Sequence, residues 1–186
     1  MDMQVPYNLK QKNYYRMKTI IIYATHHGTT ETVAHLIWSK LDLQSTELVN
    51  IAKAKHLDLS DYDIVIIGSS IHAGHNQNSI RNFCKKNTPE LLEKHLGLFL
   101  CCMMEGEEAT TNLQNAYPEI LKNKAFFVQI LGGEYKIEKM NYIERLMLKK
   151  IAGATESQSN IKYDLIDKFV QEIKQQSANK KKVISR

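Results

Sequence analysis

The chain has 186 residues, of which 43% are hydrophobic and 24% charged, as in an ordinary globular protein with one sizeable core. The net charge of +5 is concentrated at the ends, because residues 1–16 carry +2 and residues 177–186 carry +4. That leaves −1 for residues 17–176, so we expect no nucleic-acid-binding surface. No apolar run approaches the ~18 residues that span a bilayer.

These features predict three parts in the chain. Residues 1–16 lack the apolar centre of a secretory signal and are expected to be a flexible extension before Met17. Residues 17–176 are expected to form a single domain, and residues 177–186 a basic tail. The cysteines, at positions 84, 101 and 102, form no CxxC pair and no metal-ligand spacing. We therefore expect a cytoplasmic protein with reduced thiols.

The first predicted strand leads directly into the first candidate binding loop. Branched residues at 20–22 predict a buried strand, a polar turn follows at 25–30, and helical spacing begins at Thr30. The N–H groups and the positive dipole end of such a helix attract a phosphate. Thr25, Thr29 and Thr30 supply hydroxyls, and Gly28 allows close approach. The alternative is a threonine-rich helix cap that binds nothing.

The loop matches neither of the two common nucleotide-binding patterns. It has no GxxxxGK[ST] and no GxGxxG, and it contains no Lys or Arg. We therefore expect any phosphate to be held by oriented N–H groups and hydroxyls rather than by ion pairs.

Strands and helices then alternate to the end of the chain. Gly68 is expected to end the third strand before a polar loop at 69–78. Pro89 is expected to open a separate short helix. Cys101 and Cys102 are expected to face opposite sides of a strand. The predicted elements are strands at 45–50, 63–68, 96–102 and 125–131, and helices from Ser79, at 107–122 and near 162–175.

This alternation predicts an α/β fold with right-handed crossovers between parallel strands. We expect a three-layer α/β/α sandwich with a five-stranded parallel sheet of order 2-1-3-4-5. Ligands of such sheets bind at the carboxyl ends of the strands, which brings loops 25–30, 69–78 and 102–107 to one edge. Two other functions that the same sheet supports are excluded. A response regulator needs an aspartate where Gly68 stands, and a low-molecular-weight phosphatase needs a cysteine in the first loop, which has none.

Two of these loops resemble a known family. The Thr25-x-x-Gly28-x-Thr30 pattern resembles the FMN-phosphate loop of flavodoxins. Gly68, Ser70, Ile71, Gly74 and His75 match the Gly-x-Ser-Ile-x-x-Gly-His loop of the flavodoxin-domain group that contains the quinone-dependent protoporphyrinogen IX dehydrogenases. The resemblance covers roughly residues 18–175.

The resemblance implies a flavodoxin-like FMN-dependent oxidoreductase with a porphyrinogen substrate and a quinone acceptor. It also implies three groups of FMN-binding residues. The phosphate group would lie at Thr25, His26, His27, Gly28, Thr29 and Thr30, one side of the flavin ring at Ser69, Ser70, Ile71, His72, Ala73 and Gly74, and the other side at Cys102, Met103 and Met104.

The chain departs from ordinary flavodoxins in its ring-binding loops. Residues 69–78 and 103–108 contain no aromatic side chain, although Tyr135 or Tyr142 remains available to cover the ring. An open ring face suits direct contact with a flat organic substrate. The alternative is a small electron-transfer flavodoxin that shuttles electrons between protein partners, but such carriers are strongly acidic and residues 17–176 are not.

A second departure is an added segment at 133–160 before the last helix. Residues 140–151 have a helical pattern that is apolar around much of its circumference and basic at its end. Two interpretations stay open: residues 136–151 touch a quinone or the inner face of a membrane peripherally, or the helix packs on the sheet as extra core.

Four histidines fall on the predicted binding edge, at positions 26, 27, 72 and 75. A metal-dependent hydrolase is the rival that they suggest. Neither histidine loop contains an acidic residue, and adjacent His26 and His27 are not expected to face one ion. We therefore expect no metal.

Overall fold

Five parallel strands form the central sheet of the protein. A computed structural model describes residues 16–54, 56–72 and 75–184. The strand order is β2-β1-β3-β5-β6, with every neighbouring pair parallel, which confirms the predicted order. The strands are β1 (Thr19–Tyr23), β2 (Thr46–Asn50), β3 (Ile64–His72), β5 (His95–Cys101) and β6 (Phe127–Ile130).

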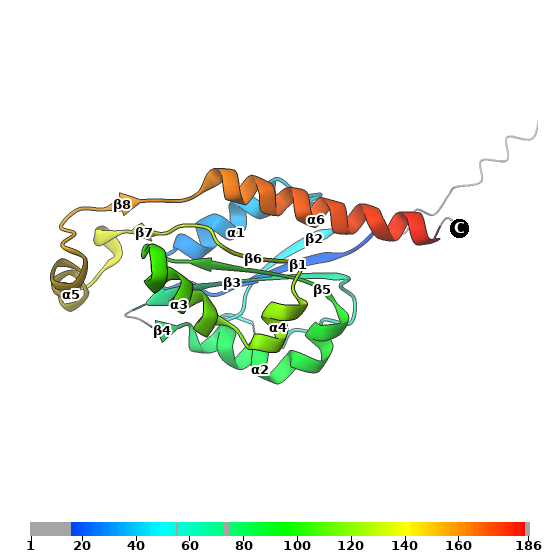
Figure 1. Ribbon diagram of the computed structural model, residues 1–186, viewed down its shortest axis with the longest axis horizontal. Helices are drawn as coiled ribbons and strands as arrows, with labels where there is room; N and C mark the ends of the chain where they lie inside the picture. Colours follow the sequence, from blue (N-terminus) through cyan, green and yellow to red (C-terminus); the bar gives the residue numbers. More distant parts are fainter. Residues whose placement is uncertain (1–15, 55, 73–74, 185–186) are drawn as a thin grey trace, which may run out of the picture.

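Helices cover both faces of this sheet (Figure 1). One face carries α1 (Thr29–Ser39) and α6 (Tyr163–Ile184). The other carries α2 (Asn78–Glu93), α3 (Gly106–Ala116) and α4 (Glu119–Lys124). The three-layer α/β/α architecture is therefore confirmed.

Alternate side chains of the strands enter two separate hydrophobic cores. Ile20 and Ile22 of β1 belong to the core under α2, whereas Ile21 belongs to the core under α1 and α6. Strands buried on both faces explain the continuous apolar runs in the sequence. Cys101 and Cys102 likewise belong to opposite cores, as their adjacent positions on an extended chain predicted.

Two helices differ from the predictions at proline residues. Pro89 lies inside α2 rather than opening a new helix, because buried Phe83 and Leu91 hold the segments on either side of it against the same core. The helix expected at 107–122 is instead divided into α3 and α4. Tyr117 is extended in front of Pro118, as a residue before proline prefers.

Two further segments are longer than expected. β3 does not end at Gly68 but continues to His72 and pairs with the short antiparallel β4 (His75–Asn76), so much of the expected polar loop is a hairpin. Ser69 and Ser70 still pair with β5 there. The last helix continues past residue 175 to Ile184, through most of the expected tail. The expected extension at 1–16 lies outside the described residues except for Arg16, as do Ala73 and Gly74.

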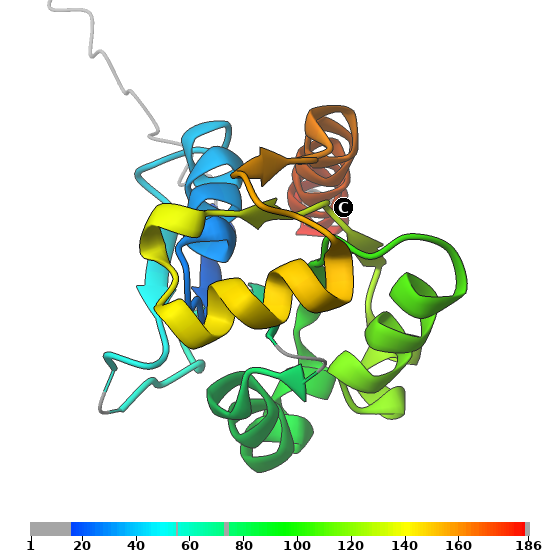
Figure 2. The same cartoon turned by 90° about the vertical axis from the view of Figure 1, so that its left-hand side faces the viewer.

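The added segment at 133–160 forms a small unit beyond the carboxyl ends of the strands. We call it the insert. Figure 2 shows its helix α5 (Tyr142–Ala152) crossing in front of that end of the sheet. The antiparallel pair β7 (Glu134–Tyr135) and β8 (Gln158–Ser159) forms its base, and the 3-10 turn η1 (Ile137–Lys139) leads into α5. None of the described helices is both long and apolar enough to cross a membrane.

Candidate functional site

A cavity of about 330 Å³ lies at the carboxyl ends of the strands, between the sheet and the insert. Parts of all three expected loops line it, so the structure brings them together at one edge. Gly28, Thr30 and Ser69 are buried behind this lining. The lining residues are Thr25, His26, His27, Thr29, Ser70, Ile71, Cys101, Cys102, Met103, Met104 and Glu108, and from the insert Gly133, Glu134, Tyr135, Met140, Glu144, Met147 and Leu148.

The loop at 25–30 turns sharply into α1 through Gly28. Gly28 is the N-cap residue and has a φ of +92°, a conformation that side chains rarely adopt. Its N–H donates to the hydroxyl oxygen of Thr25 at 2.9 Å, and its carbonyl accepts from the N–H of Thr32 at 2.9 Å. The N-cap residue is therefore a glycine without a capping side chain and not a threonine, which contradicts the threonine-cap half of the alternative, whereas ligand binding by the loop stays a prediction.

The hydroxyl of Thr30 is buried in the first turn of α1, beside the weakly accepting thiol of Cys101 and without a nitrogen or oxygen partner among the described residues. Leaving a buried hydroxyl unpaired costs about 1–3 kcal/mol. A phosphate at the helix N-terminus would accept this hydrogen bond, since the helix dipole favours an anion at the same place. The donor set of the loop therefore fits the phosphate of FMN.

Two thiols border the cavity but are not reactive. Burial raises the pKa of the Cys101 thiol to about 12, although the neighbouring Thr30 hydroxyl opposes that shift. Burial also raises the pKa of Cys102, against the effect of hydrogen bonds from Met104 and Asn112. Both side chains therefore remain protonated near neutral pH and act as packing groups.

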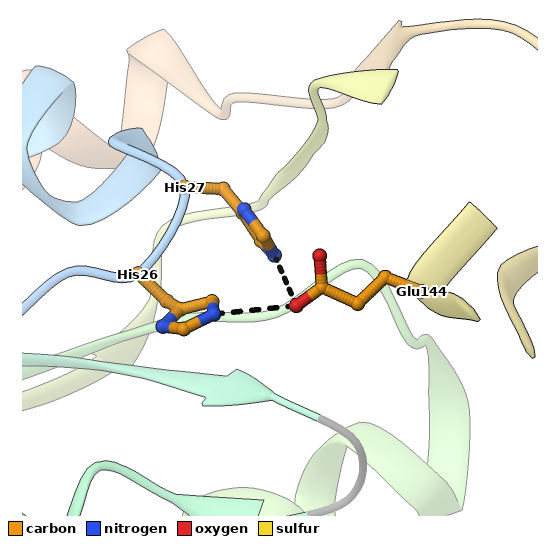
Figure 3. Close-up of side chains that lie close together, drawn as sticks. All are labelled: His26, His27 and Glu144. Atoms are coloured by element: carbon orange, nitrogen blue, oxygen red, sulfur yellow. Dashed lines mark hydrogen bonds and ion pairs between the residues drawn. The ribbon is translucent and has the colours of Figure 1, made fainter. Parts of the chain in front are cut away.

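Two adjacent histidines converge on one carboxylate of the insert (Figure 3). The Nε2 atoms of His26 and His27 lie 3.3 Å and 3.7 Å from Oε1 of Glu144, and the two rings meet edge to face. The expectation that neighbouring imidazoles cannot face one point is therefore wrong. The tight turn before Gly28 lets both side chains point toward α5, and a carboxylate from far along the chain completes the group.

Glu144 has two tasks at the start of α5. Its Oε2 accepts from the N–H of Asn141 at 2.8 Å, and its own N–H donates to the Asn141 side chain at 2.9 Å, which forms a capping box. Its Oε1 faces the two imidazoles. Two histidines and one glutamate are also a donor set that zinc accepts, and the three ligand atoms lie within 4.8 Å of one another. The expectation that these loops hold no metal stays a prediction.

The insert also brings two lysines to the loop at 25–30. Nζ of Lys136 lies 2.8 Å from Oε2 of Glu134 and donates to the Thr32 hydroxyl at 3.3 Å. A Cβ atom on Gly28 would lie 3.0 Å from Nζ of Lys139. The loop itself contains no cation, as the sequence shows, but its surroundings do.

Apart from Glu108 and Glu134, much of the remaining lining of the cavity is apolar. Ile71, Met103 and Met104 lie there, and Tyr135 adds the aromatic side chain that the sheet-edge loops lack. Burial raises the pKa of Tyr135, so its hydroxyl stays a hydrogen-bond donor. Tyr142 instead is 80% exposed. The side chains of His72 and His75 lie outside the described residues, so their expected roles stay predictions.

Helix α5 closes the cavity rather than extending the core. Met147 and Leu148 line the cavity, whereas none of the described side chains of α5 belongs to either core. The interpretation of α5 as extra core is therefore wrong. Its other face leaves Ile143 and Leu146 more than half exposed.

Comparisons with known proteins agree with this architecture. The family model described as "Flavodoxin domain" matches residues 20–162. The protoporphyrinogen IX dehydrogenase (quinone) of Escherichia coli strain K12 is 24% identical over 172 residues, which cover 84% of this chain and 94% of that protein. The protein of the same name from Leishmania major is 25% identical over 160 residues, which cover 78% of this chain and 68% of that protein.

One solved structure with a similar arrangement is the rubredoxin oxygen:oxidoreductase of the anaerobe Desulfovibrio gigas. It has a TM-score of 0.49 and 19% sequence identity over 73% of this chain. The match covers 34% of that larger protein, so this chain spans about a third of its length.

Proposed function

Since the chain belongs to the flavodoxin-domain family, we propose that it is an FMN-dependent oxidoreductase that oxidises protoporphyrinogen IX with a quinone as acceptor. One observation carries the proposal: a single cavity joins a phosphate-type loop at a helix N-terminus to apolar side chains of the sheet edge and of the insert. The names of the relatives from Escherichia coli and Leishmania major agree with this substrate and acceptor.

The residues of the loop at 25–30 would hold the FMN phosphate. Thr25, Thr29 and Thr30 supply hydroxyls, Gly28 permits close approach, and the first N–H groups of α1 point at the anion. On either side of the flavin ring we place residues 69–74 and 102–104, with Tyr135 of the insert beside them. FMN, when bound, supplies the electron-transfer chemistry, and the protein orients it and controls access.

The walls of the cavity favour an enzyme over an electron carrier. Ile71, Met103, Met104, Met147 and Leu148 present flexible apolar surface, which suits a porphyrinogen or a quinone ring. His26 and His27 stand at the same cavity, where their Nε2 atoms are placed to take up or release the protons that accompany oxidation of a porphyrinogen.

The exposed side of α5 gives a quinone a route to this cavity. Tyr142, Ile143 and Leu146 are 80%, 68% and 57% exposed, and Lys149 and Lys150 follow in the last turn. An apolar face followed by cations suits a peripheral contact with an anionic membrane surface. We place the quinone's approach there.

Purified protein tests the proposal directly. We expect it to be yellow, to release FMN on heating, and to oxidise protoporphyrinogen with a menaquinone or ubiquinone analogue without any protein partner. The alternative, an electron-transfer flavodoxin, predicts FMN release but no quinone turnover, and reduction by a protein reductase that slows as salt screens the docking charges. Stoichiometric zinc or iron without flavin would contradict both and favour a metal-dependent hydrolase.

A further inference from the structure

The insert places two amines at the loop that the proposed function assigns to the FMN phosphate. A dianionic group held only by N–H groups and hydroxyls lacks a permanent counter-ion, because the loop at 25–30 contains no Lys or Arg and its two histidines face Glu144. η1 runs past this loop, and its neighbour Lys136 hydrogen-bonds Thr32 in the first turns of α1. The Lys139 amine stands against Gly28, the residue where the loop enters the helix.

The acidic side chains near this loop already have partners other than Lys139. Glu134 pairs with Lys136 at 2.8 Å, Glu31 accepts from the Tyr23 hydroxyl at 2.8 Å, and Glu144 faces His26 and His27. Glu138 accepts from the Ser157 hydroxyl at 2.7 Å. The hydrogen bond from Ser157 chiefly lowers the pKa of Glu138, and the Lys139 charge adds to this effect. No ion pair within the described part of the chain engages the Lys139 amine, and its flexible stem leaves it able to turn toward an anion.

We propose that Lys139 binds the phosphate group of the flavin, with Lys136 adding positive charge beside it, so that the insert recognises FMN and not riboflavin. This inference rests on the proposed function, because it takes FMN as the ligand. An ammonium-to-phosphate hydrogen bond is charge-assisted and stronger than those from neutral donors. The same contact holds η1 on the loop, so binding of FMN and closure of the insert over the cavity stabilise each other.

Flavin affinities of the full-length protein test this assignment. Dissociation constants for FMN and for riboflavin are measured by quenching of flavin fluorescence, with Lys139→Gln, Lys136→Gln and, as the control, Lys149→Gln on the exposed side of α5. We expect Lys139→Gln to weaken FMN binding about tenfold and riboflavin binding less than about twofold. Lys139→Arg should restore most of the FMN affinity, because it keeps the charge.

Ionic strength gives a second readout. The FMN dissociation constant of the unmodified protein should rise more steeply with salt than that of Lys139→Gln, whereas Lys149→Gln should follow the unmodified protein. An equal loss of FMN and riboflavin affinity in Lys139→Gln would overturn the inference, because it would mean that the lysine only docks the insert. Unchanged FMN affinity would overturn it as well. An unmodified protein that binds neither flavin would overturn the proposed function together with the inference.

Discussion

At the scale of single residues, Gly28 determines both the backbone turn into α1 and the access of a ligand to the helix N-terminus. Branched side chains rarely adopt its φ of +92°, and a Cβ there would lie 3.0 Å from the Lys139 amine. We expect Gly28→Val to fold but to lose bound FMN. Flavin content per mole of protein, measured after heat release, checks this.

Gly153 is the matched control for that substitution. It also has a positive φ, +65°, but a Cβ there meets nothing within 4 Å, and it lies at the far end of α5. Gly153→Val should therefore carry a similar backbone strain, of about 1–3 kcal/mol, while keeping its FMN. Loss of flavin in both variants would attribute the effect to general destabilisation rather than to the phosphate loop.

Thr30 offers a second test, in which stability and binding change in opposite directions. Its buried hydroxyl has only the weak Cys101 thiol beside it and no nitrogen or oxygen partner among the described residues, so Thr30→Val removes a poorly paired polar group and keeps the shape. We expect the flavin-free protein to gain about 1 kcal/mol in its free energy of unfolding, and FMN affinity to fall about tenfold. Urea unfolding and flavin titration measure the two effects. A flavin-free variant that is less stable than the unmodified protein would show that the hydroxyl has a structural partner instead.

At the scale of elements, local pattern predicted the sheet well and its ends less well. The order of the strands follows from alternation and handedness, and the helix expected from Thr30 onward forms and buries Val33, Ala34 and Ile37. Hydrophobic periodicity carries no information on hydrogen-bonded strand pairing. The prediction therefore ended β3 at Gly68, although Ser69 and Ser70 still pair with β5 as far as Cys101. The two prolines had different effects. α3 ends just before Tyr117 and Pro118, whereas α2 continues through Pro89 because the segments on both sides of it pack against the same core.

The site shows the same division between local and distant information. The loop at 25–30 and its helix are local features, and the sequence located them. The contact of His26 with Glu144 spans 118 residues and that of Lys136 with Thr32 spans 104. Asn141 and Glu144 form a capping-box pattern that marks the start of a helix, but nothing in that pattern indicates which loop the helix will face. Predicting that the Lys139 amine lies beside Gly28 would have required the position of the whole insert.

At the scale of the whole molecule, we expect the sheet to fold without the insert. Its base is the β7–β8 pair, in which Tyr135 lies directly opposite Gln158. A two-residue Asn-Gly turn closes such a pair in a hairpin, so residues 136–157 can be replaced by that turn without stretching the chain. Neither core loses a residue by this change, since none of the described side chains of residues 136–157 belongs to either core.

The shortened protein separates cofactor binding from substrate turnover. The loop at 25–30 stays in place, so we expect cooperative unfolding and bound FMN, with an affinity lowered by the loss of Lys136 and Lys139. The wall formed by Met140, Met147 and Leu148 is gone, so oxidation of protoporphyrinogen by a quinone analogue should fall to the background rate. Turnover is measured with FMN at saturating concentration, which removes the difference in loading. Full turnover by the shortened protein would mean that the sheet-edge loops bind the substrate alone, and that the insert serves the cofactor and not the reaction.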